Sequence, residues 1–338
     1  MSQISPRILT LVGVGIGVSI LTAISSFIYK RLRSKKEVIP IKWRKVGTLD
    51  QLYFIPIKSC RPIELDEAFC ENLGLRKDDI KDRALMVIEK SGQVITSRTY
   101  PKMFKIIPKI VSRSELVLSA PGMEDTHFDY ADLDTKSSVS TIKALIYGFH
   151  ADVLECGEIY NKWFSQYILG EPEGLRLVYY PHQNATRPIG RFYKEGIYTK
   201  QDTGTFQDMS SFNLINNVSV DELNTRLRDD EQVPLLQFRS NFYVKNTGPA
   251  FAEDNWKWVR IGNEVVFRNI GPCYRCIVPN INPYTSERHP EGEPLKTLKT
   301  YRVFPGSKYD SPVMGIQLGL RNNGSVRKGD CVYVEETE

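Results

Sequence analysis

The longest uninterrupted run of uncharged residues extends from Ile8 to Tyr29, and Lys30 follows it directly. As a helix rising ~1.5 Å per residue, this run would just cross a hydrocarbon layer about 30 Å thick. A cleaved secretory signal would have a shorter apolar region and a small-residue cleavage site, whereas Phe27-Ile28-Tyr29 continues the apolar run up to Lys30. The pattern therefore predicts a transmembrane helix within an anchor segment, residues 1–36.

After a polar linker, residues 37–45, the hydrophobic positions come in short alternating or β-branched runs, which indicate strands. The predicted strands are Leu85–Glu89, Gln93–Thr96, Glu115–Ser119, Leu175–Tyr179, Asn241–Val244, Val259–Ile261, Glu264–Ile270 and Val332–Glu335. Lys90-Ser91-Gly92 predicts a hairpin between the first two strands, and Gly262-Asn263 predicts a tighter hairpin turn farther along the chain.

Helical patterns are few. Apolar residues recur at helical spacing from Ile159 to Ile168, and Gly170 ends the pattern. Ser219 and Glu222 form a capping box, which predicts a second helix. Many short strands with few helices favour a mainly β, barrel-like fold with small helical additions. The polar stretch Pro181–Arg191 predicts a boundary between two domains, residues 46–180 and 181–338.

Charge is distributed unevenly between the anchor and the rest of the chain. Five basic residues (Lys30, Arg31, Arg33, Lys35 and Lys36) follow the apolar run and only Arg7 precedes it, so the positive-inside rule places the remainder of the chain in the cytosol. Removing these six basic residues from the total of 45 leaves 39, against 40 acidic residues. The pI of 8.7 therefore reflects the anchor, and the near-neutral body argues against a nucleic-acid-binding face.

The most unusual local motif is Cys273-Tyr-Arg-Cys276, which follows a strong predicted strand. A zinc site would need further ligands at suitable spacing, and a thioredoxin-like pair would open a helix, which Ile277-Val278-Pro279 starts poorly. Two readings remain open at this point. The cysteines are a buried structural pair, or one thiolate binds a soft metal, with Arg275 beside it to favour the deprotonated form.

Basic, hydroxyl and amide residues recur at predicted strand ends and tight loops. They lie in Lys58-Ser59-Cys60, Thr96-Ser97-Arg98, Asp208-Met209-Ser210-Ser211 and Phe238-Arg239-Ser240-Asn241. Lysine, arginine, hydroxyl groups and loop amides are what an anionic, phosphate-bearing cofactor requires. Each residue alone is as well explained as a solvated charge or a cap, so the hypothesis depends on a pattern that links them.

Such a pattern is present. The motifs Lys58–Cys60, Arg98, Phe238–Asn241 and Cys273–Cys276, in this order behind an N-terminal anchor, closely resemble the family of mitochondrial amidoxime reducing components, which are MOSC-domain molybdenum enzymes. The resemblance runs from about Val46 to the C-terminus and includes Leu295–Arg302 and Gly329–Tyr333. It implies a MOSC N-terminal, β-barrel-like domain followed by a β-rich MOSC barrel.

The resemblance also implies a cofactor site. Cys276 would be the protein ligand to molybdenum, and the pyranopterin (molybdopterin) would supply a dithiolene. The residues implied to hold the phosphate and the pterin are Lys58, Ser59, Arg98, Ser210, Arg239, Asn241, Tyr274 and Arg275. Three positions depart from the family pattern: Ser211 and Ser240 stand where proline is usual, and Tyr274 stands where a small residue is expected and would narrow the substrate entrance.

The activity implied is the reduction of amidoximes, N-hydroxyguanidines and hydroxylamines. No GxGxxG fingerprint is present, so NADH electrons would come from partners, which the resemblance identifies as cytochrome b5 and its NADH-dependent reductase at the outer mitochondrial membrane. Two alternatives are a sulfur-relay MOSC protein of the molybdenum-cofactor sulfurase type and a non-catalytic membrane tether. The first would need a large pyridoxal-phosphate domain, and intact Cys276, Arg239, Arg98 and Lys58 argue against the second.

Overall fold

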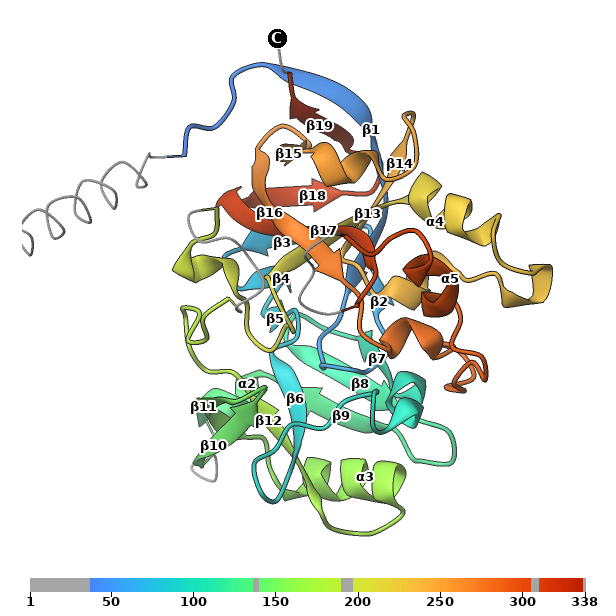
Figure 1. Cartoon of the computed structure of the whole chain (residues 1–338). Helices are drawn as coiled ribbons and strands as arrows, with labels where there is room; N and C mark the ends of the chain where they lie inside the picture. Colours follow the sequence, from blue (N-terminus) through green and yellow to red (C-terminus); the bar gives the residue numbers. More distant parts are fainter. Residues whose placement is uncertain (1–36, 136–139, 190–196, 305–309, 337–338) are drawn as a thin grey trace, which may run out of the picture. The chain divides into compact units, whose positions relative to one another are not determined.

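Seven strands, most of them from the C-terminal half of the chain, close into a barrel. The computed structural model describes residues 37–135, 140–189, 197–304 and 310–336. The strands follow one another in the order β14 (Phe242–Asn246), β13 (Phe212–Asn216), β17 (Val313–Asn322), β16 (Val265–Tyr274), β15 (Trp258–Ile261), β19 (Cys331–Glu335) and β1 (Trp43–Phe54). Because β1 also pairs with β14, this sheet closes on itself, and the short β2 (Ile63–Glu64) extends it beyond β1 (Figure 1).

The barrel interior is filled by aromatic and branched side chains from alternating strand positions. The Phe212 ring lies 5.8 Å from that of Phe242 and 5.1 Å from that of Phe267, each on a different strand. The seam between β1 and β14 requires a glycine, because a Cβ atom at Gly47 would lie 2.3 Å from the carbonyl oxygen of Lys245. Inward-facing residues on every strand are what a small closed barrel needs to exclude water.

Three smaller sheets accompany the barrel. One contains β10 (Thr141–Ile146), β11 (Phe149–Glu155), β12 (Leu175–Tyr179) and β6 (Leu85–Glu89). The second contains β18 (Gly324–Arg327), β3 (Glu67–Glu71), β4 (Gly74–Lys77) and β5 (Ile80–Lys81), and the third contains β7 (Ile107–Ile110), β8 (Glu115–Ser119) and β9 (Thr126–Asp129). Since β18 comes from the C-terminal half and pairs with β3, the two halves of the chain interlock.

Helices are short in the described residues. They are α2 (Ala131–Thr135), α3 (Glu158–Leu169), α4 (Asn217–Asn224) and α5 (Leu295–Lys299), with 3-10 turns that include η4 (Leu235–Phe238) and η6 (Val278–Asn280). The predicted end of α3 is confirmed: Gly170 adopts the left-handed conformation, φ 81°, which glycine allows at little cost. The mainly β fold predicted from the sequence is likewise confirmed.

Two local predictions are wrong. The segment Gln93–Thr96 forms isolated bridges and not a continuous strand. Val94 pairs antiparallel with Ile88 of β6, as the predicted hairpin requires, while Gln93 pairs in parallel with Leu145 of β10. Ser219 does not cap α4. The helix begins earlier, at Asn217, where the side chain of Asn216 accepts a hydrogen bond from the Val218 amide. The Ser219 hydroxyl is instead directed to the buried carboxylate of Glu253.

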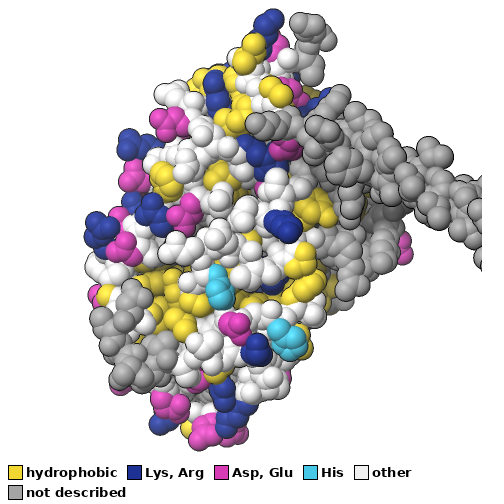
Figure 2. Space-filling view, turned by 90° about the vertical axis from the view of Figure 1, so that its left-hand side faces the viewer, with side chains coloured by type: hydrophobic (Ala, Val, Ile, Leu, Met, Phe, Trp, Pro, Cys, Tyr) yellow, Lys and Arg dark blue, Asp and Glu magenta, His cyan; other side chains and the backbone are white. Residues whose placement is uncertain are grey.

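The predicted anchor, residues 1–36, lies outside the described residues. Among the described helices, none is both long and apolar enough to pass through a bilayer. The strand β1 begins at Trp43, three residues inside the predicted linker, so Trp43–Lys45 belong to the barrel. The domain boundary at Pro181 stays a prediction, although β1 is supplied to the barrel from the N-terminal side of it. On the face that Figure 2 shows, acidic and basic side chains are interspersed, in keeping with the near-neutral body.

Candidate functional site

All nine residues proposed from the sequence line one cavity. They are Lys58, Ser59, Arg98, Ser210, Arg239, Asn241, Tyr274, Arg275 and Cys276. The N-terminal half contributes loops at residues 58–59, 83 and 96–98 and the tip of the β10–β11 hairpin. The C-terminal half contributes residues 207–210, the start of β14 and the end of β16. The structure thus gathers residues that are far apart in the sequence, while their individual roles stay predictions.

Among the charged residues of the cavity, Arg239 has the most unusual hydrogen bonding. It follows η4 in the left-handed conformation, φ 54°, and its Nη2 donates to the carbonyl of Cys60 at 2.8 Å. Its Nη1 is buried and has no hydrogen-bond partner among the described residues. Burial, together with the neighbouring charge of Arg83, lowers the pKa of Arg239 to about 10. A buried cation without a carboxylate partner is costly, so the site favours an anionic ligand.

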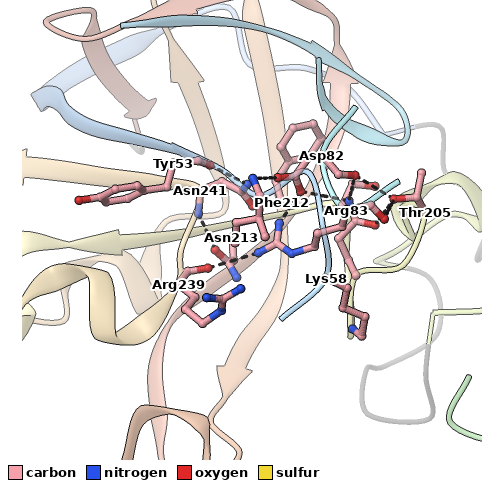
Figure 3. A network of polar contacts seen from close by, with 12 residues as sticks. Tyr53, Lys58, Asp82, Arg83, Thr205, Phe212, Asn213, Arg239 and Asn241 are labelled. Atoms are coloured by element: carbon pink, nitrogen blue, oxygen red, sulfur yellow. Dashed lines mark hydrogen bonds and ion pairs between the residues drawn. The ribbon is translucent and has the colours of Figure 1, made fainter. Parts of the chain in front are cut away.

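Arg83 provides a second cation beside Arg239 and was missed in the sequence. Its Nη2 donates to the Arg239 carbonyl at 3.3 Å (Figure 3). Its Nη1 pairs with Asp82, which is fully buried and also accepts from the Ile55 amide at 2.7 Å. Asp82 therefore fixes Arg83 against β1, and the guanidinium becomes a rigid part of the cavity wall.

A second group of charges lies toward the exposed side of the cavity. The Asp208 carboxylate accepts hydrogen bonds from Lys58, from Arg98 Nη2 at 2.6 Å and from the Tyr147 hydroxyl at 2.9 Å. Burial lowers the pKa of Lys58 to about 8, against the opposing effect of Asp208. Although burial acts to raise it, the charges of Lys58 and Arg98 hold the pKa of Asp208 well below its usual range. Asp208 is therefore a carboxylate at neutral pH, whereas Lys58 is close to losing its proton.

The two cysteines of the motif have different surroundings. Cys273 is buried on β16, where burial raises the pKa of its thiol, and its sulfur lies 2.9 Å from the side-chain amide nitrogen of Gln317. Cys276 follows the strand, lines the cavity and is only partly buried. All six cysteines lie in described ranges, and none forms a disulfide. Both cysteines line the cavity, but Cys276 is the more exposed of the two, and its role as a ligand stays a prediction.

The hydrogen bonds around Gln317 define the state of Cys273. The Ser210 hydroxyl faces two acceptors, the Phe212 carbonyl at 2.6 Å and Gln317 Oε1, but it has one hydrogen to donate. Turning the Gln317 amide by half a rotation satisfies both groups, since its nitrogen then donates to Ser210 and its oxygen accepts from the Cys273 thiol. In this arrangement Cys273 is a neutral thiol, in agreement with the effect of burial on its pKa, and its structural role stays a prediction.

Arg275 and Asn241 brace the cavity through the backbone. Arg275 donates to the Met314 carbonyl through Nε (2.9 Å) and Nη2 (2.6 Å), and to the Phe238 carbonyl through Nη1 (2.8 Å). It therefore ties the residue before Cys276 to β17 and to η4. The side-chain amide of Asn241 donates to the Tyr53 carbonyl at 3.1 Å, which joins β14 to β1. The expected contacts of both side chains with a cofactor stay predictions.

Several lining residues of this cavity were not proposed as site residues from the sequence, and four of them carry the contacts described above: Arg83, Tyr147, Asp208 and Gln317. Asp208 stood in a loop that the sequence had already marked, next to Ser210. The other three carry no local signal, because each reaches the cavity through a contact far away in the sequence. The described residues, those of this cavity included, contain no group of three or more His, Cys, Asp or Glu side chains suited to a metal ion.

Comparison with known proteins assigns both halves of the chain. Residues 46–171 match the MOSC N-terminal beta barrel domain, and residues 201–333 match the MOSC domain. Mitochondrial amidoxime-reducing component 1 of Mus musculus is 30% identical over 319 residues, which cover 92% of this chain and 88% of that protein. Mitochondrial amidoxime reducing component 2 of Bos taurus is 32% identical over 297 residues, which cover 86% and 84%. A solved structure of the YuaD protein of Bacillus subtilis is 9% identical, covers 88% of this chain and all of that chain, and has a TM-score of 0.35, too low to bear on the argument.

Proposed function

Because the chain belongs to the MOSC-domain family of amidoxime-reducing components, we propose that it is a molybdenum-dependent reductase of N-hydroxylated compounds, namely amidoximes, N-hydroxyguanidines and hydroxylamines. The observation that carries the proposal is the meeting, in one cavity, of a partly exposed cysteine with a buried arginine that has no anionic partner among the described residues. A sulfur ligand for a soft metal and a cation for a phosphate are the two things that a molybdenum pyranopterin needs from a protein.

The cation set fits the anionic end of such a cofactor. Arg239 and Arg83 lie side by side, and Asp82, the carboxylate that forms an ion pair with Arg83, is already committed to it. A phosphate accepts several N–H groups at once, and Arg239 Nη1 offers one that is unused. We propose that Arg239 and Arg83 hold the phosphate, with Ser59 and Asn241 on the adjoining walls.

Cys276 is proposed as the single protein ligand to molybdenum. When bound, the cofactor supplies the two electrons that convert an N–OH group to N–H with release of water. That reaction consumes two protons. Lys58 Nζ is a candidate source of one of them, because its pKa of about 8 places a labile proton beside Asp208. Asp208 holds the ammonium in place through its ion pair and stays ionised itself.

Electron delivery is proposed to come from cytochrome b5 and its NADH-dependent reductase, in keeping with a chain that has no nucleotide-binding fingerprint. The mitochondrial names of the relatives and the apolar run with its basic flank support a cytosol-facing body on the outer mitochondrial membrane. The Arg288 side chain donates to the carbonyl of Arg98, which lines the cavity, so a further basic side chain lies next to the site. Such basic side chains suit an acidic electron donor.

The two cysteines provide the decisive test. Cys276→Ser should abolish reduction of benzamidoxime while much of the pterin stays bound, because the phosphate contacts remain. Cys273→Ser is the matched control. It should keep most of the activity, because serine can still donate to the Gln317 side chain, at the cost of some stability. Activity is measured with a chemical reductant, and X-ray absorption should show one sulfur neighbour fewer on molybdenum in the Cys276 variant only. Full activity of Cys276→Ser, or equal losses in both variants, would refute the assignment.

A further inference from the structure

The tip of the β10–β11 hairpin carries a residue that its turn does not favour. Ile146 pairs with Phe149, so Tyr147 and Gly148 alone form the turn (Figure 1). Both have positive φ, 49° and 88°, as in a type I′ turn. Asn, Asp or Gly adopts the first position of this turn readily, whereas an aromatic residue there costs about 1 kcal/mol or more. Something other than turn formation must therefore favour tyrosine at this position.

Core packing does not supply that reason, because Tyr147 as a residue remains 36% exposed. The position instead brings the tyrosine side chain to the cavity. The hairpin belongs to the four-stranded sheet of the N-terminal half, yet its tip lines the cavity together with Cys276 and Asp208. An exposed residue that has a strained backbone conformation and lines a site is typical of a functional rather than a packing role.

The contacts of Tyr147 hold its ring in one orientation. Its hydroxyl donates to Asp208 at 2.9 Å and accepts from Arg98 Nη2 at 3.3 Å. The Lys58 Nζ atom and the Arg98 guanidinium carbon each lie 5.3 Å from the ring centroid. Because its hydroxyl is bonded to two partners and two cations lie over its ring, the tyrosine has little freedom, so the exposed part of the ring is a fixed, flat wall of the cavity.

We infer that Tyr147 is a specificity-determining residue, which holds flat, conjugated N-hydroxylated substrates by stacking on their ring system. The charges around it disfavour a cationic substrate, since Lys58 and Arg98 outnumber Asp208 by one. Aryl amidoximes are neutral and flat near pH 7, whereas alkyl amidoximes offer the same reacting group without the ring. The inference rests on the proposed reductase function and names the substrate type that the site retains best.

The test compares two substrates that differ only in the ring, benzamidoxime and acetamidoxime, with the cofactor-loaded full chain and a reduced viologen dye as electron source. Tyr147→Asn is the main variant, because asparagine suits the turn and keeps the hairpin folded. It should raise the KM for benzamidoxime about three- to tenfold, which corresponds to the loss of one aromatic contact. The KM for acetamidoxime should change less than twofold. Tyr147→Phe keeps the ring and should retain most of the preference for benzamidoxime.

Tyr284→Ala is the matched control, because Tyr284 is 54% exposed and does not line the cavity. It should leave the ratio of the two KM values unchanged. The melting temperature of Tyr147→Asn should equal or exceed that of the wild type, which a purely structural role would not allow. Equal losses for both substrates, or no change for either, would overturn the inference while leaving the reductase function intact. Failure of the loaded wild type to reduce both substrates would instead refute the proposed function.

Discussion

At the scale of single residues, some polar groups near the cavity have unusual hydrogen-bond partners. Ser240, one of the departures from the family pattern, illustrates this. Its amide donates to the Tyr243 hydroxyl at 3.1 Å, and that hydroxyl in turn donates to the Leu235 carbonyl. A proline at this position would have no N–H to donate. The serine is therefore accommodated by a buried tyrosine that keeps the loop before Asn241 in place.

Arg239 is the residue for which the largest single effect is expected. Arg239→Glu places a like charge against the cofactor's phosphate and removes an N–H donor that no described group uses. A hydrogen bond to a charged group contributes roughly 1.5–3 kcal/mol, so the cofactor content after purification should fall at least tenfold. Molybdenum analysis and pterin fluorescence measure the content.

The control for this prediction is Arg113→Glu, which reverses a charge on an arginine that is 75% exposed and paired with Asp79. It should leave the cofactor content unchanged. Full occupancy in Arg239→Glu, with an unaltered circular dichroism spectrum, would show that the phosphate is held elsewhere.

At the scale of elements, the start of α4 depends on a buried acid. Glu253 has no exposed surface, and its carboxylate accepts from the Ser219 hydroxyl at 2.8 Å and from the Asn216 amide at 3.3 Å. Burial raises the pKa of Glu253 from 4.5 to about 7. The carboxyl group thus joins the end of β13 to the first turn of α4, and it is about half protonated at pH 7.

The raised pKa of Glu253 predicts a pH dependence of stability. Between pH 4.5 and 7 the folded chain holds a proton that the unfolded chain releases, so the stabilising effect of protonation is lost as pH rises through this window. Glu253→Gln removes the titration. Its free energy of unfolding relative to the wild type should therefore rise from pH 5 to pH 8, by up to roughly 3 kcal/mol.

Denaturant unfolding at several pH values measures this difference. Asp221→Asn is the matched control, since it removes an exposed carboxylate from the same helix. The Glu253 prediction is wrong if the free energies of unfolding of both variants change with pH in the same way as that of the wild type.

At the scale of the whole molecule, the first strand of the barrel begins at Trp43, a few residues after the predicted anchor in the sequence. Trp43, Arg44 and Lys45 pair with Glu335, Val334 and Tyr333 of β19. The Arg260 guanidinium lies 5.0 Å from the Trp43 ring and 4.4 Å from the Tyr333 ring. The point at which the anchor can be removed is therefore set by the barrel and not by the polar composition of the predicted linker.

Two shortened chains test this arrangement. A chain that starts at residue 38 should stay soluble after alkaline carbonate treatment, bind the cofactor and reduce N-hydroxylated substrates. A chain that starts at residue 46 loses three residues of β1 and the Arg260 contact, so its melting temperature should be lower by a few degrees. The full chain should stay with membranes. Its release by carbonate would contradict the anchor, and equal melting temperatures would contradict the role of Trp43–Lys45.

The sequence by itself determined the elements whose signals are local. The strands Leu85–Glu89, Glu115–Ser119 and Leu175–Tyr179 occur at their predicted bounds, because alternation or a β-branched run reports burial directly. The end of α3 at Gly170 follows from one glycine. The hairpin turn at Gly262 is also present, with Glu264 added to the loop between β15 and β16. The motif residues, recognised through a family resemblance, line a single cavity.

The tertiary structure alone decided which segments meet. Periodicity reports that a face is buried but not which strand covers it, so the pairing of Gln93 with Leu145 and of β1 with β14 was not predictable. Ser219 does not cap the helix as predicted, because its hydroxyl donates a hydrogen bond to Glu253, which is distant in sequence. Arg83 and Tyr147 reach the cavity only because Asp82 and Asp208 hold them there. Each of these outcomes depends on contacts between residues far apart in the chain, and such contacts leave no trace in the local pattern of hydrophobic and polar positions.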